Sequence, residues 1–539
     1  MPRTPDTSDL VRNLAMRRLN RRQVTGGVVG SALASALVPG RGLAWQEATP
    51  EGAAEGEPAY GGTLIYARNI DAKTLDPHFS AQWSERFMLY NIYNTLVSWD
   101  TDFNIIPELA QSWEILEDGT GIVFNLVPNA VFHDGTACDA TAVKWNLDRI
   151  LNPDNNSNQR GQLEQAVASV EATDPTTLFI ALKKPWRPLL AALGERPGFV
   201  VSPTAVENSG DQFALNPVGS GPFKFVEWVP DSHIIVERFE DYWDEGKPYL
   251  DRIEMRHVPD TQVAVTMVRT GEAQLTDEVD PPMVEALADA TDLHVVNYES
   301  WRWNSMQMDV DKPPFDNTDF RQALAYGTDR ETVLQLVFGG TGRVMTHPIA
   351  GGWAYDPQLD SLMQYDPAKA QELLASSGVA GQTLTMTTDN TRINTDLVQL
   401  LQAQYQELGV NVQIETVDSA DYFSLIKDDT IPWGPANWTP RADPDGLLRI
   451  LWHSTGFQNS NGYNNPEVDR LLDEAAGIYD TEKAAELYHE AERIIVEDAS
   501  YVFIQAPAEF AVVRNEVGGF VYYPDLVLRL RNMWLNTPM

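Results

Sequence analysis

The chain has 539 residues and a formal net charge of −38, and 43% of its residues are hydrophobic. It is too long for one hydrophobic core, so two or three domains are expected, and its acidity argues against nucleic-acid binding, which needs exposed Lys and Arg. The single cysteine, Cys138, excludes an internal disulfide and a cysteine zinc site, and is expected to be a small buried or half-buried residue.

Residues 1–44 have the composition of a secretory signal. Basic residues come first, a weakly apolar run covers 24–38, and small residues end the segment. The run is shorter than the roughly 20 residues that span a bilayer. The pair Arg21-Arg22 before this run is typical of twin-arginine signals. We therefore expect export and an extracytoplasmic location; the alternative is a disordered basic tail followed by a buried helix.

The elements expected in the first part of the chain follow a flexible linker. Residues 45–60 are rich in Gly, Ala, Glu and Pro and lack periodicity, which is typical of a linker. A strand is expected over 62–67 and a helix over 84–97. Residues 107–127 predict two strands joined by a turn at Asp118-Gly119. A helix is expected from a capping Asp139 to Ile150, and the polar segment 152–162 is expected to be a loop.

The remaining elements alternate between strand and helix. A Gly/Pro-rich crossing segment is expected over 216–222. Strands are expected over 178–182, 223–228, 234–238, 253–257, 383–387 and 410–416, with 223–238 forming a hairpin. Helices are expected over 261–269, 319–337, 367–377, 393–408, 466–476 and 481–497. This alternation indicates an α/β protein with helices packed on sheets, and no internal repeat is visible.

Several segments, in order along the chain, resemble the extracellular solute-binding proteins of family 5. The segments are 109–150, which contains Phe132-His133-Asp134-Gly135, 216–243, 249–275, 320–343 and 463–475. This family comprises the oligopeptide-, dipeptide- and nickel-binding receptors of ABC importers. The similarity extends from about residue 61 to about residue 530, nearly the whole of the chain after the predicted signal.

The resemblance implies an α/β, two-lobed periplasmic-binding-protein fold with an extra subdomain in the first lobe and a ligand cleft between the lobes. The implied division is a first lobe of 61–90 with 216–298 and 508–539, an accessory subdomain of 91–215, and a second lobe of 299–507. It also implies a monomer that traps a small-molecule or peptide ligand by hinge closure and presents it to a membrane permease of an ABC importer. No cofactor is expected.

The loop 435–445 is the main candidate for the ligand site. In peptide-binding relatives a Trp and an Asp-Pro pair stand here, and the Asp receives the ligand's α-ammonium; Trp438 and Asp443 match them. Asp443 is equally suited to capping a helix that starts near Gly446. Arg441 departs from the family pattern. It could hold a ligand carboxylate or phosphate, or it could pair with Asp443 or Asp445.

Four further tryptophans are candidates for stacking on a ligand. Trp301 and Trp303 would share one face of a strand, where they could contact ligand or cover a hinge. Trp83 and Trp353 are also expected at the cleft, with packing in the core as the alternative for each.

No catalytic or metal-binding motif stands out. The resemblance implies that His133-Asp134 belongs to a structural turn, and the other histidines lack metal-ligand spacing. No P-loop or Gly-x-Ser-x-Gly motif is present. We therefore expect a non-enzymatic receptor for a peptide or peptide-like solute. The alternatives are a secreted hydrolase of glycans or peptides with Asp443 and Asp445 as its carboxylates, and a sensor or chaperone with the same fold.

Overall fold

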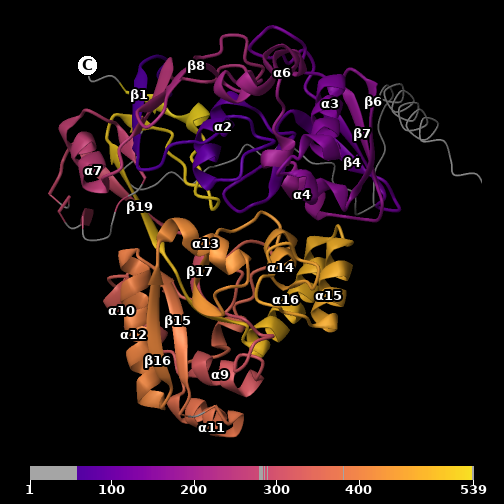
Figure 1. Cartoon of the computed structure of the whole chain (residues 1–539). Coiled ribbons are helices and arrows are strands. Elements are labelled where there is room, and N and C mark those ends of the chain that lie inside the picture. The colour runs from indigo at the N-terminus through magenta and orange to yellow at the C-terminus, as the bar shows by residue number, and fades with distance from the viewer. Residues whose placement is uncertain are drawn as a thin grey trace, which may run out of the picture.

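The computed structural model describes residues 57–536 except 278, 280–282, 285, 288 and 380. The predicted signal and most of the predicted linker therefore lie outside the described residues. The described chain folds into two lobes (Figure 1), each with its own sheet. The N-terminal elements and the last strands build the upper lobe of the figure, and the segment between them builds the lower lobe.

The first lobe is built on a seven-stranded sheet of order β12-β19-β11-β1-β10-β9-β8. Its strands are β1 (Thr63–Arg68), β8 (Phe223–Val229), β9 (His233–Arg238), β10 (Arg252–His257), β11 (Leu275–Thr276), β12 (Leu293–Glu299) and β19 (Ala508–Arg514). β1 is parallel to β10 and β11, and β8 and β9 form the predicted antiparallel hairpin. Helices α2 (Arg86–Ile92) and α7 (Thr261–Thr270) bury apolar side chains in this lobe.

An accessory subdomain extends the first lobe. Its antiparallel sheet has the order β4-β5-β7-β6. Its elements are β4 (Ala110–Ile115), β5 (Gly121–Leu126), β6 (Val167–Asp174), β7 (Thr177–Leu182), α3 (Ala140–Leu151), α4 (Arg160–Glu164), α5 (Pro188–Ala192) and α6 (Pro203–Ser209). The side chain of Asp139 accepts hydrogen bonds from Thr141 N and Ala142 N at 2.9 and 3.0 Å, so the predicted cap of α3 is confirmed. Cys138 is buried, as expected, and burial raises the pKa of its thiol to about 12.

The His133-Asp134 turn holds the accessory subdomain against the first lobe. His133 Nε2 lies 2.9 Å from Gly221 O, and Ser202 Oγ donates to Asp134 at 2.6 Å. Gly219 and Gly221, in the Gly/Pro-rich segment 216–222, lie against the end of α2. A Cβ on Gly219 would be 2.1 Å from Ile92 O. These contacts agree with a structural role for the turn.

The second lobe combines two sheets with the helices α9 to α16. A four-stranded sheet has the order β14-β18-β13-β17, and β15 and β16 form a parallel pair. The strands are β13 (Trp303–Met308), β14 (Arg343–Val344), β15 (Thr383–Asp389), β16 (Asn411–Val417), β17 (Trp433–Trp438) and β18 (Tyr501–Ala506). The helices are α9 (Thr318–Tyr326), α10 (Arg330–Val337), α11 (Pro367–Ser377), α12 (Arg392–Leu408), α13 (Ser419–Lys427), α14 (Asp445–Trp452), α15 (Pro466–Ala476) and α16 (Thr481–Asp498).

Shorter elements complete the described chain. They are the strands β2 (Val97–Trp99), β3 (Ile105–Pro107), β20 (Val517–Gly518) and β21 (Trp534–Leu535), and the 3-10 helices Trp83–Glu85, Pro153–Asn155, Arg196–Gly198, Gly210–Leu215, Leu359–Ser361 and Leu530–Asn532.

Three predicted elements are wrong in extent. The helix predicted over 84–97 ends at Ile92, and Val97 begins β2. The helix predicted over 319–337 is two helices, because the chain leaves α9 at Gly327 and Asp329 caps α10 through Thr332 N at 3.0 Å. The polar segment 152–162, predicted to be a loop, contains a 3-10 turn and the start of α4.

The chain passes between the lobes twice. It crosses from β12 to β13 and returns from β18 to β19. The two crossings lie side by side, since Ser300 N donates to Pro507 O at 3.2 Å. This paired connection leaves the lobes joined by two short segments, which suits a hinge.

Candidate ligand-binding site

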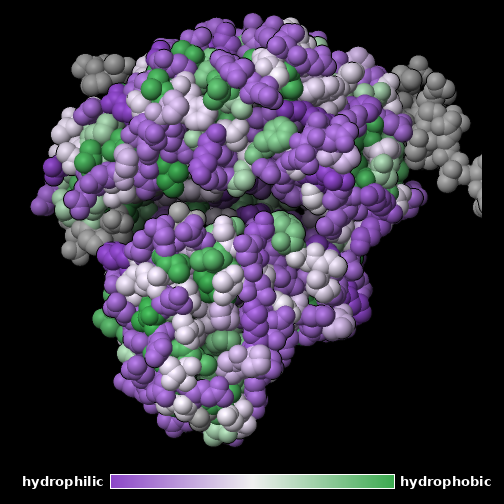
Figure 2. Space-filling model, in the orientation of Figure 1, coloured by the Kyte–Doolittle hydropathy of each residue, from purple (hydrophilic) through white to green (hydrophobic). Residues whose placement is uncertain are grey.

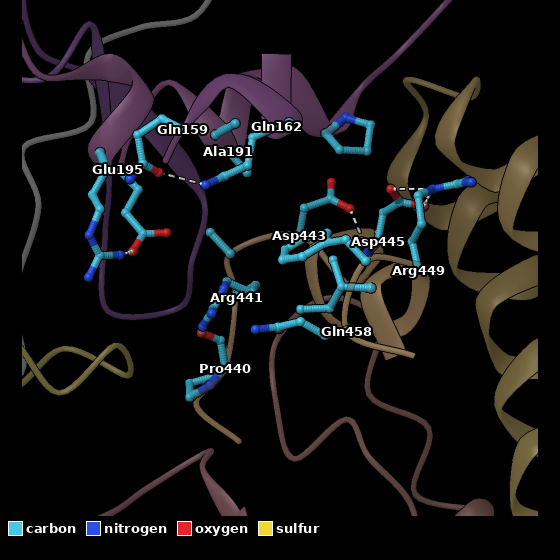
Figure 3. A pocket seen from close by; sticks show the side chains of 18 of the residues that line it. Gln159, Gln162, Ala191, Glu195, Pro440, Arg441, Asp443, Asp445, Arg449 and Gln458 are labelled. Carbon is cyan, nitrogen blue, oxygen red and sulfur yellow. Dashed lines mark hydrogen bonds and ion pairs between the residues drawn. The ribbon is translucent and has the colours of Figure 1, made fainter. Parts of the chain in front are cut away.

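A cavity of about 440 Å³ opens where the accessory subdomain and first lobe meet the second lobe. Figure 2 shows the groove between the lobes on the outer surface. Figure 3 shows Gln159, Gln162, Ala191 and Glu195 on one side of the cavity and Arg441, Asp443 and Gln458 on the opposite side. A cavity of this size is in the range of small-molecule binding sites.

Asp443 is held by an arginine from the opposite side of the cleft. Arg187, at the start of α5, forms a two-pronged ion pair with it, in which Nη2 lies 3.2 Å from Oδ1. Burial raises the pKa of the Asp443 carboxyl, and the Arg187 charge opposes that rise. Both side chains are almost fully buried, and the Arg187 guanidinium neutralises the charge of the Asp443 carboxylate.

Arg187 makes further contacts that join the accessory subdomain to the second lobe. Its Nη2 donates to Tyr488 Oη and its Nε to Ile478 O, both at 2.9 Å. Its guanidinium carbon lies 4.5 Å from the centre of the Trp353 ring, a cation–π geometry. The described structure therefore has the two sides of the cleft in direct contact.

Asp443 and Asp445 also shape the start of α14. Asp443 Oδ1 accepts a hydrogen bond from Asp445 N at 3.0 Å, so the helix-start role considered for Asp443 coexists with its position on the cavity wall. Asp445 pairs with Arg449 one turn later at 2.9 Å. Burial raises the pKa of Asp445, and Arg449 opposes the rise.

Glu195, on the first-lobe side of the cavity, lies near three arginines that come from both lobes. Arg86 and Arg196 each lie 2.8 Å from its Oε1. Burial alone would raise the pKa of Glu195, but Arg86, Arg196 and Arg441 together lower it to about 2. Glu195 is therefore ionised at neutral pH, and its negative charge partly balances the positive charges of these arginines.

Arg441 has no ion-pair partner among the residues that the structure describes. Its Nη1 donates to its own loop, at Thr439 O, Thr439 Oγ1 and Pro440 O, between 2.8 and 3.1 Å. The predicted alternative of a pair with Asp443 or Asp445 is wrong, because Arg187 and Arg449 hold those carboxylates. Burial lowers the pKa of Arg441, and the charge of Glu195 opposes this.

The five predicted tryptophans are spread over different environments. Trp303 is fully buried in the second-lobe core against Trp452, Tyr501 and Phe503, so its expected place at the cleft is wrong. Trp301 precedes β13 and does not share a face with Trp303. It packs on Phe103 at 5.2 Å, and a Cβ on Gly351 would be 2.3 Å from its indole.

The remaining three tryptophans do not line the cavity. Trp438 ends β17 and packs on the second-lobe core, and Trp353 lies against Arg187 and Tyr488. Trp83 packs on Phe87 and donates to Asp525 O at 3.4 Å. Of the seven predicted site residues, Arg441 and Asp443 line the cavity.

The amino-acid sequence alone did not reveal most of the residues on the first-lobe side of the cavity. Trp99, Trp186, Arg86, Arg196, Glu195 and the glutamines 159, 162 and 165 line it. The one local signal was Pro185-Trp186-Arg187-Pro188, an aromatic and a cation between two prolines. The rest come from separate segments that only the fold brings together.

The described residues hold no cluster of three or more potential metal ligands. Within the same residues, no helix is long and apolar enough to cross a membrane. The cavity is lined by charged, amide and aromatic groups, which suits an organic solute that is recognised by hydrogen bonds and stacking.

Curated relatives of this chain are binding proteins. The chain is 30% identical over 464 residues to the glutathione-binding protein GsiB of Pectobacterium atrosepticum, covering 84% of this chain and 90% of that protein. It is 29% identical over 475 residues to GsiB of Salmonella typhimurium, covering 86% of this chain and 92% of that protein.

Solved structures and a family profile agree with these relatives. The periplasmic binding protein DppA of Helicobacter pylori, in complex with the peptide STSA, superposes with a TM-score of 0.79 at 27% identity, covering 89% of this chain and 99% of that one. CtaP of Listeria monocytogenes gives 0.80 at 24% identity, covering 89% and 100%, and so supports the fold alone. Residues 104–459 match the profile described as bacterial extracellular solute-binding proteins, family 5 Middle. The chain therefore belongs to the family 5 extracellular solute-binding proteins, the two-lobed receptors of ABC importers.

Proposed function

We propose that this receptor captures a peptide or peptide-like solute in the cavity beside Arg441 and Asp443 and closes around it. The observation that carries the proposal is the cavity itself, whose walls come from both sides of the cleft. Closure removes the solute from water, so that a few charge-assisted hydrogen bonds can fix its orientation. The relatives named as glutathione- and peptide-binding proteins support this class of solute.

The closed receptor then delivers its solute to an ABC permease, without chemical conversion. We propose that it acts as a monomer, in which 61–90, 216–298 and 508–539, with the subdomain 91–215, move as one body against 299–507. The paired crossings at Ser300 and Pro507 support this division. The hydrolase alternative finds little support, because Asp443 and Asp445 are both engaged by arginines.

The chain is proposed to reach the outside of the cytoplasmic membrane through residues 1–44 as a twin-arginine signal. The pair Arg21-Arg22 ahead of the apolar run 24–38 supports this route. Replacing both arginines with lysine is expected to retain the protein in the cytoplasm. Unchanged export of that variant would favour another route.

The solute class is tested by thermal shift and calorimetry with glutathione and a set of Ala-X-Ala tripeptides. A ligand that binds only the native state raises the melting temperature, so at least one peptide is expected to do so. Mass spectrometry of the bound solute after incubation checks for turnover, and an intact solute is expected. A cleaved peptide would support the hydrolase alternative, and a lack of binding by every peptide would contradict the proposed class.

A further inference from the structure

The charges that line the cavity are not balanced. Four carboxylates line it: Glu195, Asp443, Asp445 and Asp525. Glu195 is paired with Arg86 and Arg196, Asp443 with Arg187, Asp445 with Arg449, and Asp525 with Arg529. For Glu195, Asp445 and Asp525 the shortest N–O distance lies between 2.8 and 2.9 Å. No carboxylate of the described lining is left without a cation.

Two cations of the lining, in contrast, have no carboxylate within ion-pair distance among the described residues. They are Arg441, which is half-buried, and Lys427, which is exposed at the end of α13. Arg86, on the first-lobe side of the cavity, shares Glu195 with Arg196, and its buried Nε has no hydrogen-bond partner among the described residues. In a chain of net charge −38, a cavity with surplus positive charge is a local exception.

Arg441 is held in place before any ligand arrives. Its Nη1 is anchored by Thr439 and Pro440, which fixes the plane of the guanidinium. A guanidinium presents its donors in a rigid fork that matches a carboxylate or phosphate. Figure 3 shows Arg441 on the second-lobe side of the cavity, across from Glu195.

We infer that the ligand is recognised through an anionic oxygen group, a carboxylate or phosphate, by Arg441, and that Asp443 is not its ammonium receptor. This inference rests on the proposed function and narrows its solute class. Asp443 cannot pair with a ligand amine without giving up Arg187, which would leave a guanidinium buried and unpaired between Tyr488 and Trp353. A free amino terminus is therefore dispensable for binding, whereas an acidic group is essential.

The experiment compares capped forms of the same probes by calorimetry. Each Ala-X-Ala tripeptide is used free, N-acetylated, C-amidated and doubly capped, with X including glutamate and phosphoserine. Acetylation is expected to change the dissociation constant of the best binder by less than about 3-fold. Removing its last anionic group is expected to weaken binding by about 10- to 100-fold, as for a lost hydrogen bond to a charged group. The phosphoserine and glutamate arms separate phosphate from carboxylate recognition.

Variants of Arg441 connect this preference to the structure. Arg441→Gln is expected to raise the dissociation constant of the acidic probe by about 10-fold or more and to leave that of the doubly capped, uncharged form unchanged. Arg441→Lys keeps the positive charge but not the forked geometry, so its dissociation constant for the acidic probe is expected to lie between those of the wild type and Arg441→Gln. Arg392→Gln removes an exposed positive charge from α12 of the same lobe and serves as the matched control. Melting of each unliganded variant checks that the loop still folds.

The possible outcomes separate this inference from the proposed function. If acetylation abolishes binding and amidation does not, the peptide class holds and the anion inference is overturned. If no peptide form binds but citrate or glucose 6-phosphate does, with loss in Arg441→Gln, the inference holds and the peptide class is wrong. If neither class of probe binds, or if Arg441→Gln binds the acidic probe as tightly as the wild type does, the inference fails.

Discussion

At the scale of single residues, the ionisation of the Glu195 carboxyl group is set by the charges of arginines from several segments of the chain. Arg86 comes from α2, Arg196 is its chain neighbour, and Arg441 reaches the same region from the second lobe. Their combined charge overcomes the cost of burial and holds its pKa at about 2, below the usual 4.5. A group whose pKa falls on folding stabilises the folded state wherever it is ionised.

Glu195 therefore gives a pH-dependent prediction. Its contribution to the free energy of unfolding should be fully present above about pH 4.5 and should be lost as the pH falls towards about 2. The difference of about 2.5 pKa units corresponds to about 3 kcal/mol. In urea unfolding at a series of pH values, Glu195→Gln is expected to lose less stability than the wild type across this window.

Glu467→Gln, at an exposed pair with Arg470, is the matched control and should leave the acid dependence close to that of the wild type. Parallel acid profiles of the wild type and Glu195→Gln would contradict the assignment.

The residue scale also marks the limit of what the sequence could predict about the site. Asp443 was found because it matches the Asp-Pro pair that the family resemblance implies, and Arg441 was found because it departs from that pattern; both line the cavity. Arg187 was missed because its partner, Asp443, is 256 positions away. Trp303 was misplaced because alternation along a strand says which residues share a face, and says nothing of whether that face meets a cleft or a core.

At the scale of elements, local signals predicted helices well when a capping side chain was present. Asp139 ahead of α3 illustrates this, and so do the limits of α11 and α15, which match their predicted ranges. The break between α9 and α10 was missed, because the apolar periodicity continues through Gly327 and a cap at Asp329 interrupts it. A cap inside a periodic segment thus outweighed the periodicity.

The cap of α3 gives a prediction at this scale. Asp139→Ala removes the acceptor of Thr141 N and Ala142 N and is expected to lower the free energy of unfolding by about 1 kcal/mol. Asp148→Ala, on the exposed surface of the same helix, is the matched control, and the loss of its pair with Lys144 should cost less. Chemical denaturation followed by circular dichroism measures both. Equal losses of unfolding free energy in the two variants would mean that the capping hydrogen bonds stabilise the protein no more than the exposed ion pair does.

At the scale of the whole molecule, Arg187 connects the accessory subdomain to the second lobe when the cleft is closed. Its ion pair with Asp443 and its bonds to Tyr488 and Ile478 exist only while the two bodies touch. Arg187→Ala is therefore expected to shift the unliganded receptor towards an open form, which small-angle X-ray scattering would detect as a larger radius of gyration.

A matched control, Lys184, lies three residues before Arg187 in the same segment. Lys184 pairs with Asp473 across the same boundary at 3.2 Å, but both side chains are about half exposed. Exposed pairs contribute little, so Lys184→Ala should leave the radius of gyration unchanged. An equally compact Arg187→Ala protein would show that the contact does not bias closure.

The overall architecture was the most predictable level, because it follows from family resemblance as well as from patterns of strand and helix. The two lobes, the hairpin β8–β9 and the alternating second lobe all match the expectation. The cavity wall is the least predictable level, because its residues are drawn from the accessory subdomain, the first lobe and the second lobe at once.

The position of β19 has a consequence for how the chain acquires its structure during synthesis. β19 inserts between β11 and β12, and β12 has no other neighbour in that sheet. A ribosome must therefore produce the whole second lobe before residues 508–514 emerge and give β12 its partner. Contacts this distant in sequence form slowly. The first lobe is thus expected to remain unfinished, with open strand edges, until almost the entire polypeptide has been released. A nascent chain of this kind would gain from chaperone protection more than a receptor whose lobes fold one after the other.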